Sequence, residues 1–170
     1  MQRTIAPIRA LVAAARARRI PVIWTRHGFR DARDAGVFFE LRPFLKEGGL
    51  RQGTWGSAIM DGLGAIADDW TIDKTRLSAF YSTNLEATLR ALKAETVLFA
   101  GVLTNQCVAA TSKDANFRDF KPIVVEDCTG TTLPHLHAPA IEMIRVGWGE
   151  VRSLEETLAE IARLPVAKAG

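Results

Sequence analysis

Apolar residues recur along the chain in two alternating patterns, one with a helical period and one in short continuous runs. Between Arg3 and Arg18 they recur every three or four positions, which predicts an amphipathic helix. The next run, Ile20–Thr25, is apolar and β-branched, as is typical of a buried strand. Residues 26–53 have no clear period and contain several Gly, Asp and Arg residues. We expect a long loop with short helical pieces there, and loops of that length are often functional.

The same alternation continues to the end of the chain. Further strands are predicted at Trp70–Lys74, Thr96–Val102, Pro122–Glu126 and Glu150–Arg152. Helices are predicted at residues 57–67, 105–118 and 138–146. Two more helices are predicted to begin at capping boxes, one at residues 83–86 and one at residues 153–156. This order predicts a parallel sheet covered by helices on both faces. In such sheets ligands bind outside the carboxyl ends of the strands, so the ends at Lys74 and Val102 are the candidate site.

Length and composition narrow the class of protein. A chain of 170 residues is the size of one domain, which we assign to residues 1–170. Its 48% hydrophobic and 24% charged residues are ordinary for a globular protein. The net charge of +3 is spread along the chain, which disfavours nucleic-acid binding. The sequence contains no run of about 18 apolar residues, so a membrane-spanning helix is not predicted. Arginines interrupt the apolar N-terminal segment, which disfavours a signal peptide. Two cysteines make no disulfide framework, so we expect a cytoplasmic protein.

The first chemical signal is Cys107 in the segment GVLTNQCV, residues 101–108. A buried strand runs here into a tight turn, and Cys107 falls in the first turn of the following helix. The first amides of a helix are unpaired and carry partial positive charge, so they stabilise a thiolate and can hold an oxyanion. The alternative is that Cys107 is a small buried apolar residue, as free cysteines usually are.

The second signal is Lys74 in the segment DKTRLSAF, residues 73–80. A lysine that ends a buried strand and faces a cleft can hold a neighbouring anion, and here it would steady a thiolate. The alternative is a lysine that extends to solvent from the end of the strand. Neither segment decides between its alternatives when it is taken alone.

Taken together, the two segments resemble the isochorismatase-like cysteine hydrolases. That superfamily includes ureidoacrylate hydrolase, N-carbamoylsarcosine amidase, biuret hydrolase and nicotinamidase. The resemblance runs from the first helix through Trp148 and is strongest around the two segments. Residues 82–90 and Asp127 also fit the ureidoacrylate branch.

The resemblance implies a three-layer α-β-α sandwich around a mostly parallel, six-stranded sheet. It implies an amidohydrolase in which Cys107 attacks the carbonyl carbon of a small amide, carbamoyl or ureido compound and forms a thioester that water cleaves. The oxyanion would lie against the amides of Leu103 and Cys107, with a cis peptide bond before Leu103. Lys74 would favour the charged states around it. No cofactor is implied, and members of the family are commonly homo-oligomers, either dimers or tetramers.

The sequence departs from the family at its beginning. In the family an Asp at the end of the first strand acts as general base and acid, and that strand lies in the middle of the sheet. Here the residues before Ile20 fit the helix that follows that strand, so we expect the first strand to be missing. Three explanations remain open. The chain starts at an internal Met of a longer gene product, it is a catalytically impaired homologue that serves as a ligand-binding or assembly subunit, or another acid substitutes. Asp73 is expected to point to the opposite face of its strand, and Asp127 is expected to be structural.

Other residues carry weaker signals. Nicotinamidases bind a metal after the second strand, but His27 has no second histidine nearby, and we expect His135 and His137 to be a solvated loop pair. Two imidazoles alone make a poor zinc site, so no metal is predicted and nicotinamide is disfavoured as a substrate. Isochorismate cleavage is a further alternative, although members with that activity generally lack the cysteine.

Four residues are candidates for substrate binding. Arg76 either clamps a substrate carboxylate through two parallel hydrogen bonds or makes a structural ion pair. Phe29, Trp55 and Phe80 either line the pocket or pack in the core or an interface. Cys128 is expected to be inert.

Overall fold

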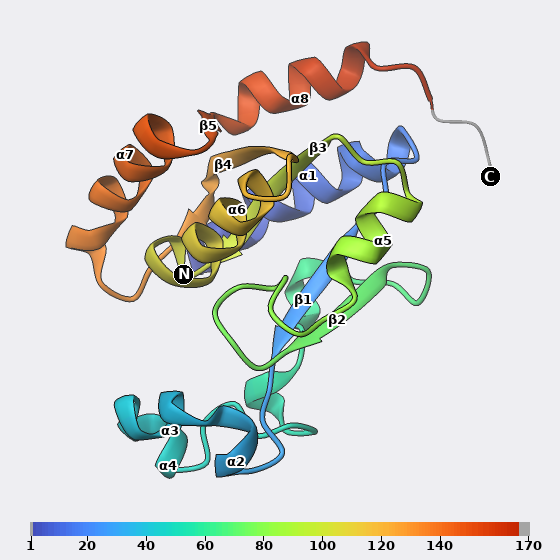
Figure 1. Ribbon diagram of the computed structural model, residues 1–170. Coiled ribbons are helices and arrows are strands. Elements are labelled where there is room, and N and C mark those ends of the chain that lie inside the picture. Colours follow the sequence, from blue (N-terminus) through green and yellow to red (C-terminus); the bar gives the residue numbers. More distant parts are fainter. Residues whose placement is uncertain (1, 167–170) are drawn as a thin grey trace.

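Helices and strands alternate along the chain in the computed structural model, which describes residues 2–166 (Figure 1). The strands are β1 (Ile23–His27), β2 (Trp70–Lys74), β3 (Thr96–Val102), β4 (Lys121–Gly130) and β5 (Glu150–Arg152). The helices are α1 (Ile5–Ala17), α2 (Ala32–Ala35), α3 (Val37–Leu41), α4 (Pro43–Lys46), α5 (Leu85–Ala91), α6 (Ala109–Asn116), α7 (His137–Gly147) and α8 (Leu154–Arg163). Short turns are η1 (Gln2–Thr4), η2 (Trp55–Ser57), η3 (Asp61–Leu63), the π-helical η4 (Thr104–Val108) and η5 (Pro134–Leu136).

The five strands are all paired in parallel, but they form two separate sheets. β1 pairs with β2, and β4 lies between β3 and β5. Within residues 2–166, no hydrogen-bonded ladder joins β1 to β3. In Figure 1 the β1–β2 pair lies apart from the other three strands.

Side-chain packing nevertheless places β1 and β3 in one layer. Ile23 of β1 packs in the same apolar cluster as Val97 and Phe99 of β3. Trp24, the next residue of β1, packs in a second cluster with Leu98 of β3. Because successive side chains of a strand point to opposite faces, this alternation shows that the two strands share the same two faces.

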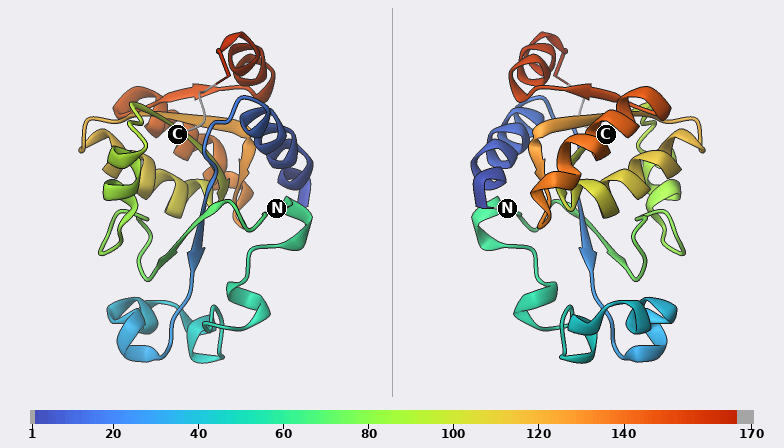
Figure 2. Two further views of the ribbon diagram at one scale, coloured as in Figure 1. Left: turned by 90° about the vertical axis from the view of Figure 1, so that its right-hand side faces the viewer. Right: turned by 90° about the vertical axis from the view of Figure 1, so that its left-hand side faces the viewer.

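Helices cover both of these faces and make the fold a three-layer α-β-α sandwich, as predicted (Figures 1 and 2). α1 and α8 pack on one face through the cluster that contains Leu11, Val125 and Ile161. α5, α6 and α7 pack on the other face, where Leu89 and Ile144 are buried. No helix in the described part of the chain is both long enough and apolar enough to span a membrane.

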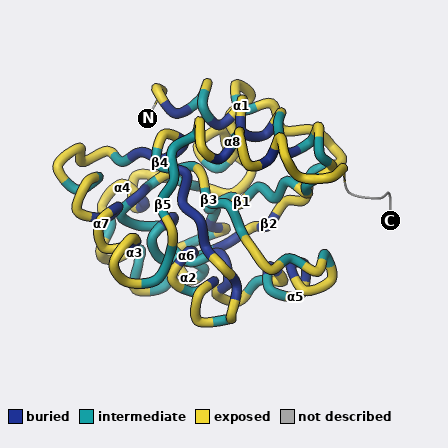
Figure 3. The backbone as a smooth tube through the Cα atoms, turned by 90° about the horizontal axis from the view of Figure 1, so that it is seen from above, coloured by how far each residue is buried: buried dark blue, intermediate teal, exposed yellow. Residues whose placement is uncertain are grey.

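The strands next to the division are less buried than β4. Val124 and Val125 of β4 are 0% exposed, whereas Val102 of β3 is 45% exposed (Figure 3). All five residues of β1 are only partly buried or exposed. A strand inside a covered sheet is normally buried on both faces, so β1 and β3 have the exposure of edge strands among the described residues.

Strand positions were predicted more accurately than helix ends. The predicted ranges of β2, β3 and β5 are confirmed, and Ser153 caps α8 through the predicted capping box. The predicted helix at residues 57–67 is wrong: only the turns η2 and η3 form there, and Gly64 adopts a left-handed conformation that ends η3. The capping box at residues 83–86 is also wrong, because α5 begins at Leu85 and the Thr83 hydroxyl accepts from the Leu85 amide instead of the Glu86 amide.

The predicted long loop after β1 folds into a small lobe. It contains α2, α3 and α4 around the buried residues Phe29, Ala35 and Leu45, and lies at the bottom of Figure 1. The expectation of short helical pieces in this loop is confirmed.

The division of the sheet predicts uneven protection of backbone amides from exchange with solvent. We expect amides of β4 to exchange at least about ten-fold more slowly than those of β1 and β3, because each of the latter has one unpaired edge. Hydrogen–deuterium exchange followed by mass spectrometry measures this. Equal protection of β1, β3 and β4 would contradict it.

Candidate functional site

Lys74 is a buried lysine at the carboxyl end of β2. Its side chain points to the same face of the strand as Ile72, and both residues are 3% exposed. The Lys74 ammonium donates to the backbone carbonyls of Arg76 at 2.9 Å and Leu77 at 3.1 Å. Its third contact is with the sulfur of Cys107, where Nζ and Sγ are 3.3 Å apart. The three N–H bonds of the ammonium thus have three partners inside the protein.

Burial and the sulfur act on this ammonium in opposite directions. Burial lowers the pKa of Lys74, because a charged group loses its hydration inside a protein. The charge and hydrogen bond of the Cys107 sulfur raise the same pKa and offset part of this effect. The ammonium and a thiolate therefore stabilise each other.

Cys107 lies in the π-helical turn η4, which directly follows β3. The predicted helix over residues 105–118 is divided here, with the wider turn η4 first and α6 from Ala109. The Leu103 carbonyl accepts hydrogen bonds from the amides of Gln106 at 3.0 Å and Val108 at 3.2 Å. The peptide bond between Val102 and Leu103 is cis, as the resemblance implies.

A hydroxyl group ties the Cys107 turn to the loop that follows Lys74. Thr111 Oγ1 donates to the Cys107 carbonyl at 2.6 Å and accepts from the Ala79 amide at 3.1 Å. On the other side of the turn, Thr131 Oγ1 donates to Asn105 Oδ1 at 2.8 Å. These bonds fix the sulfur relative to the end of β2, so the two segments singled out in the sequence meet at one point.

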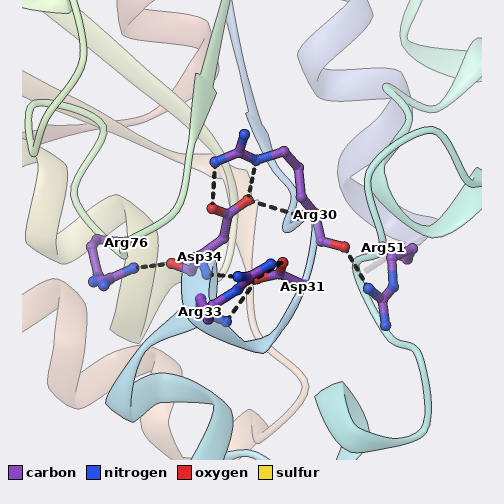
Figure 4. A network of polar contacts seen from close by, with 6 residues as sticks. All are labelled: Arg30, Asp31, Arg33, Asp34, Arg51 and Arg76. Atoms are coloured by element: carbon purple, nitrogen blue, oxygen red, sulfur yellow. Dashed lines mark hydrogen bonds and ion pairs between the residues drawn. The ribbon is translucent and has the colours of Figure 1, made fainter.

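Arg76 links the same loop to the small lobe. Its Nη1 donates to the carbonyl of Asp34 at 2.7 Å (Figure 4). The same nitrogen donates to the carbonyl of Thr75 at 2.8 Å. Gly36 permits this approach, because a Cβ atom there would lie 2.8 Å from Arg76 Nη2. Arg76 thus has a structural role through carbonyl groups rather than through the predicted ion pair, and its contact with a substrate carboxylate stays a prediction.

The three predicted aromatic residues lie in different surroundings. Phe29 is buried in the core of the lobe, and Phe80 is buried against Phe120 at a ring distance of 6.1 Å. Trp55 is 87% exposed. Packing occupies both phenylalanine rings in this conformation, and a contact of any of the three with substrate stays a prediction.

The two nearby carboxylates named in the sequence have other partners. Asp73 lies on the opposite face of β2 from Lys74, as predicted, and makes two hydrogen bonds with Arg26 at 2.6 and 2.8 Å. Asp127 accepts from the Leu154 amide at 2.6 Å and so has the expected structural role at the start of α8. Among residues 2–166, the hydrogen bonds and ion pairs of Lys74 and Cys107 involve no carboxylate.

His27 is a neighbour of Lys74 that the sequence analysis treated only as a metal ligand. The two residues are partners in the β1–β2 register, so their side chains lie on the same face. The His27 ring packs against Phe29 and Phe38, with ring centroids 4.8 and 5.7 Å away. Its Nε2 is buried and has no hydrogen-bond partner in the described part of the chain. Burial, followed by repulsion from Lys74, lowers the pKa of His27 to about 4.

His137 differs from the expectation of a solvated loop pair. It begins α7, its side chain is only 17% exposed, and its Nδ1 lies 3.0 Å from the hydroxyl of Thr104 in the Cys107 turn. The prediction is therefore wrong for His137, whereas His135 is exposed. Within the described ranges, no group of three or more His, Cys, Asp or Glu residues could hold a metal ion. Cys128 is fully buried, and burial raises the pKa of its thiol to about 12, consistent with an inert group.

Comparisons with known proteins agree with the sequence motifs and the fold. The profile described as the isochorismatase domain matches residues 1–156. A ureidoacrylate amidohydrolase, RutB, of Methylobacterium radiotolerans is 34% identical over 179 residues, covering 95% of this chain and 69% of the relative. A cysteine hydrolase from Pseudomonas syringae has a similar structure, with a TM-score of 0.89, 28% identity, and coverage of 95% of this chain and 81% of that chain. An N-carbamoylsarcosine amidase from Thermoplasma acidophilum follows at a TM-score of 0.76, 27% identity, and coverage of 91% and 84%.

Removing the ammonium tests its effect on the sulfur. In Lys74→Met we expect iodoacetamide to alkylate Cys107 at least about ten-fold more slowly at neutral pH, because the thiolate loses its neighbouring positive charge. The rate is measured by mass spectrometry of the labelled peptide. Lys121→Met is the control, since Lys121 is exposed at the start of β4. An unchanged rate in Lys74→Met would show that the charge does not act on the sulfur.

The lowered pKa of His27 predicts a loss of stability in acid. Folded His27 stays neutral down to a pH of about 4, whereas the unfolded chain takes up this proton near the ordinary pKa of 6.5. The free energy of unfolding should therefore fall as the pH decreases from 6.5 to 4, by about 1–2 kcal/mol from this partly buried group. His27→Phe should lose less stability over this range. Urea unfolding of both proteins at several pH values measures the difference, and parallel losses would refute it.

Proposed function

Because the chain belongs to the isochorismatase family, we propose that it is an amidohydrolase that uses Cys107 to cleave a C–N bond of a small linear amide, carbamoyl or ureido compound. The observation that carries the proposal is the 3.3 Å contact between the buried Lys74 ammonium and the Cys107 sulfur. A structural lysine or an inert core cysteine does not require this contact.

The reaction begins with attack of the Cys107 thiolate on the substrate carbonyl carbon. The carbonyl oxygen takes up the negative charge and is held by the amides of Leu103 and Cys107, as the resemblance to the family implies. Collapse of the tetrahedral intermediate breaks the C–N bond, and the leaving nitrogen takes a proton from a water molecule to depart as ammonia or an amine. Water then attacks the thioester carbon, releases the acid product and restores the sulfur.

Lys74 acts through its charge in this scheme. It stabilises the thiolate before attack and the negative charge that develops afterwards. Its bonds to the carbonyls of Arg76 and Leu77 hold the ammonium in place, so it does not have to reorganise during the reaction.

The names of two relatives indicate the substrate class. Ureidoacrylate and N-carbamoylsarcosine both carry a carbamoyl group on nitrogen, and the proteins named for them resemble this chain over nine-tenths of its length. We propose such a carbamoyl or ureido compound as the substrate. A site for substrate carboxylate at Arg76 would have to use the part of the guanidinium that does not bond to Asp34 and Thr75.

A second candidate function is that of a catalytically impaired homologue that binds a ligand or serves as an assembly subunit. The absence of a carboxylate from the contacts of Lys74 and Cys107 in residues 2–166 favours it. Proton transfer to the leaving nitrogen is the step that would suffer, because an amine departs poorly without a proton.

Substitution of the two central residues tests the leading proposal. Cys107→Ala should abolish ammonia release from ureidoacrylate, and Lys74→Met should reduce kcat/KM by at least about 100-fold, with both proteins still folded by circular dichroism. Cys128→Ala, which removes a buried thiol of high pKa, should still release ammonia from ureidoacrylate. Full activity of Cys107→Ala would refute the thioester mechanism.

The two candidate functions predict different combinations of Cys107 alkylation and substrate turnover. A hydrolase should show both rapid alkylation of Cys107 by iodoacetamide and release of ammonia from a panel of amides and ureides. An impaired homologue should bind ureidoacrylate in calorimetry without releasing ammonia. Turnover that disappears on alkylation of Cys107 would exclude the second function.

A further inference from the structure

The turn that carries Cys107 begins with a buried hydroxyl group that the proposed mechanism does not use. Thr104 is 0% exposed and is the first residue of η4, directly after Leu103 and three positions before Cys107. Its Oγ1 lies 3.0 Å from Nδ1 of His137. A buried hydroxyl without a partner costs free energy, so this contact helps to hold the turn in its observed position.

The other ring nitrogen of His137 faces an acidic side chain. Its Nε2 lies 3.9 Å from a carboxylate oxygen of Glu126 in β4, and the second oxygen of Glu126 lies 3.8 Å from Arg145 in α7. The side chain of His137 is 17% exposed, compared with 42% for Glu126 and 50% for Arg145. The contacts thus run from the partly exposed surface of β4 and α7 inward to the turn beside the sulfur.

The contact between Thr104 and His137 can persist whether the imidazole is neutral or protonated. A threonine hydroxyl can both donate and accept a hydrogen bond. It donates to Nδ1 when that nitrogen carries no proton, and it accepts from Nδ1 when that nitrogen is protonated. In the neutral tautomer in which Nδ1 accepts from Thr104, Nε2 carries the proton and faces the Glu126 carboxylate at 3.9 Å. His137 is therefore suited to hold the turn rather than to move protons at the substrate.

We propose that His137 is a positioning residue of the Cys107 site. It holds Thr104, and through Thr104 it sets where the Cys107 sulfur and the amides of Leu103 and Cys107 lie relative to Lys74. The catalytic part of this inference rests on the proposed function, whereas its effect on the reactivity of Cys107 does not.

Other bonds allow the turn to stay folded when this contact is removed. Asn105 is bound by Thr131, and the Cys107 carbonyl is bound by Thr111. Loss of the Thr104–His137 contact should therefore loosen the start of η4 without unfolding the sandwich, which makes the role of His137 accessible to substitution.

The first experiment compares three substitutions. His137→Leu removes both contacts, and we expect it to lower kcat about ten-fold with KM changed less than about two-fold, and to slow the alkylation of Cys107 similarly. His137→Asn places an amide group near the position of Nδ1 and should recover most of both rates. His135→Leu is the matched control, since His135 is exposed two residues earlier, and should change neither rate.

The second experiment tests whether His137 acts through Thr104. Thr104→Val keeps the shape of the side chain and removes the hydroxyl, so it should slow both rates as His137→Leu does, whereas Thr104→Ser should recover them. The double variant should be little slower than either single one, because both remove the same contact.

A merely structural role gives different results. If His137→Leu lowers the melting temperature but leaves the alkylation rate per folded molecule unchanged, the proposal is overturned. The proposal is also overturned if the fold-changes of His137→Leu and Thr104→Val multiply in the double variant, because the two substitutions would then act independently. If the wild-type chain releases no ammonia, the proposed function fails, but the alkylation rates of the same variants still decide the role of His137.

Discussion

A charged ammonium inside a protein needs partners for each of its N–H bonds, and this requirement organises the centre of the molecule. Lys74 meets it with two carbonyls of the chain that follows it and with the Cys107 sulfur. The carbonyls require the backbone to fold back directly after β2. The sulfur requires the turn after β3 to reach the same point. The covering helices and the hydroxyl of Thr111 keep these two strand ends together.

The sequence was sufficient for three strands and for the pairing of Lys74 with Cys107. It was insufficient for their surroundings and for the bounds of the other two strands, because β1 lies at Ile23–His27 and not at Ile20–Thr25, and β4 extends from Lys121 to Gly130 and not only from Pro122 to Glu126. Strands β2, β3 and β5 are short apolar segments whose ends follow from local pattern, and the two chemical segments combine into a resemblance that places them together. The π-helical form of the Cys107 turn, the partnerless Nε2 of His27 and the Thr104–His137 contact depend on packing between distant segments. Local pattern contains no information on such contacts, so His137 was predicted to be solvated.

The site contains some of the groups that the expected reaction needs, but not all of them. The candidate nucleophile, a neighbouring charge and the candidate oxyanion donors come together at the carboxyl ends of β2 and β3. The acid that the family places on its first strand has no counterpart among the described contacts, because Asp73 and Asp127 bind Arg26 and the start of α8. Within residues 2–166 the contacts of Lys74 and Cys107 thus supply a neighbouring charge but no carboxylate for proton transfer.

The division between β1 and β3 also has a consequence for the behaviour of the protein in concentrated solution. β3 is a seven-residue segment, TVLFAGV, with no charge and no proline, and within residues 2–166 one of its backbone edges is not paired with another strand. Such segments readily recruit strands from neighbouring molecules, as in amyloid-like stacking. Charged residues that discourage such stacking lie only beside the strand, where Lys93 and Glu95 precede it. Colloidal stability of this chain should therefore depend on how well that edge is shielded.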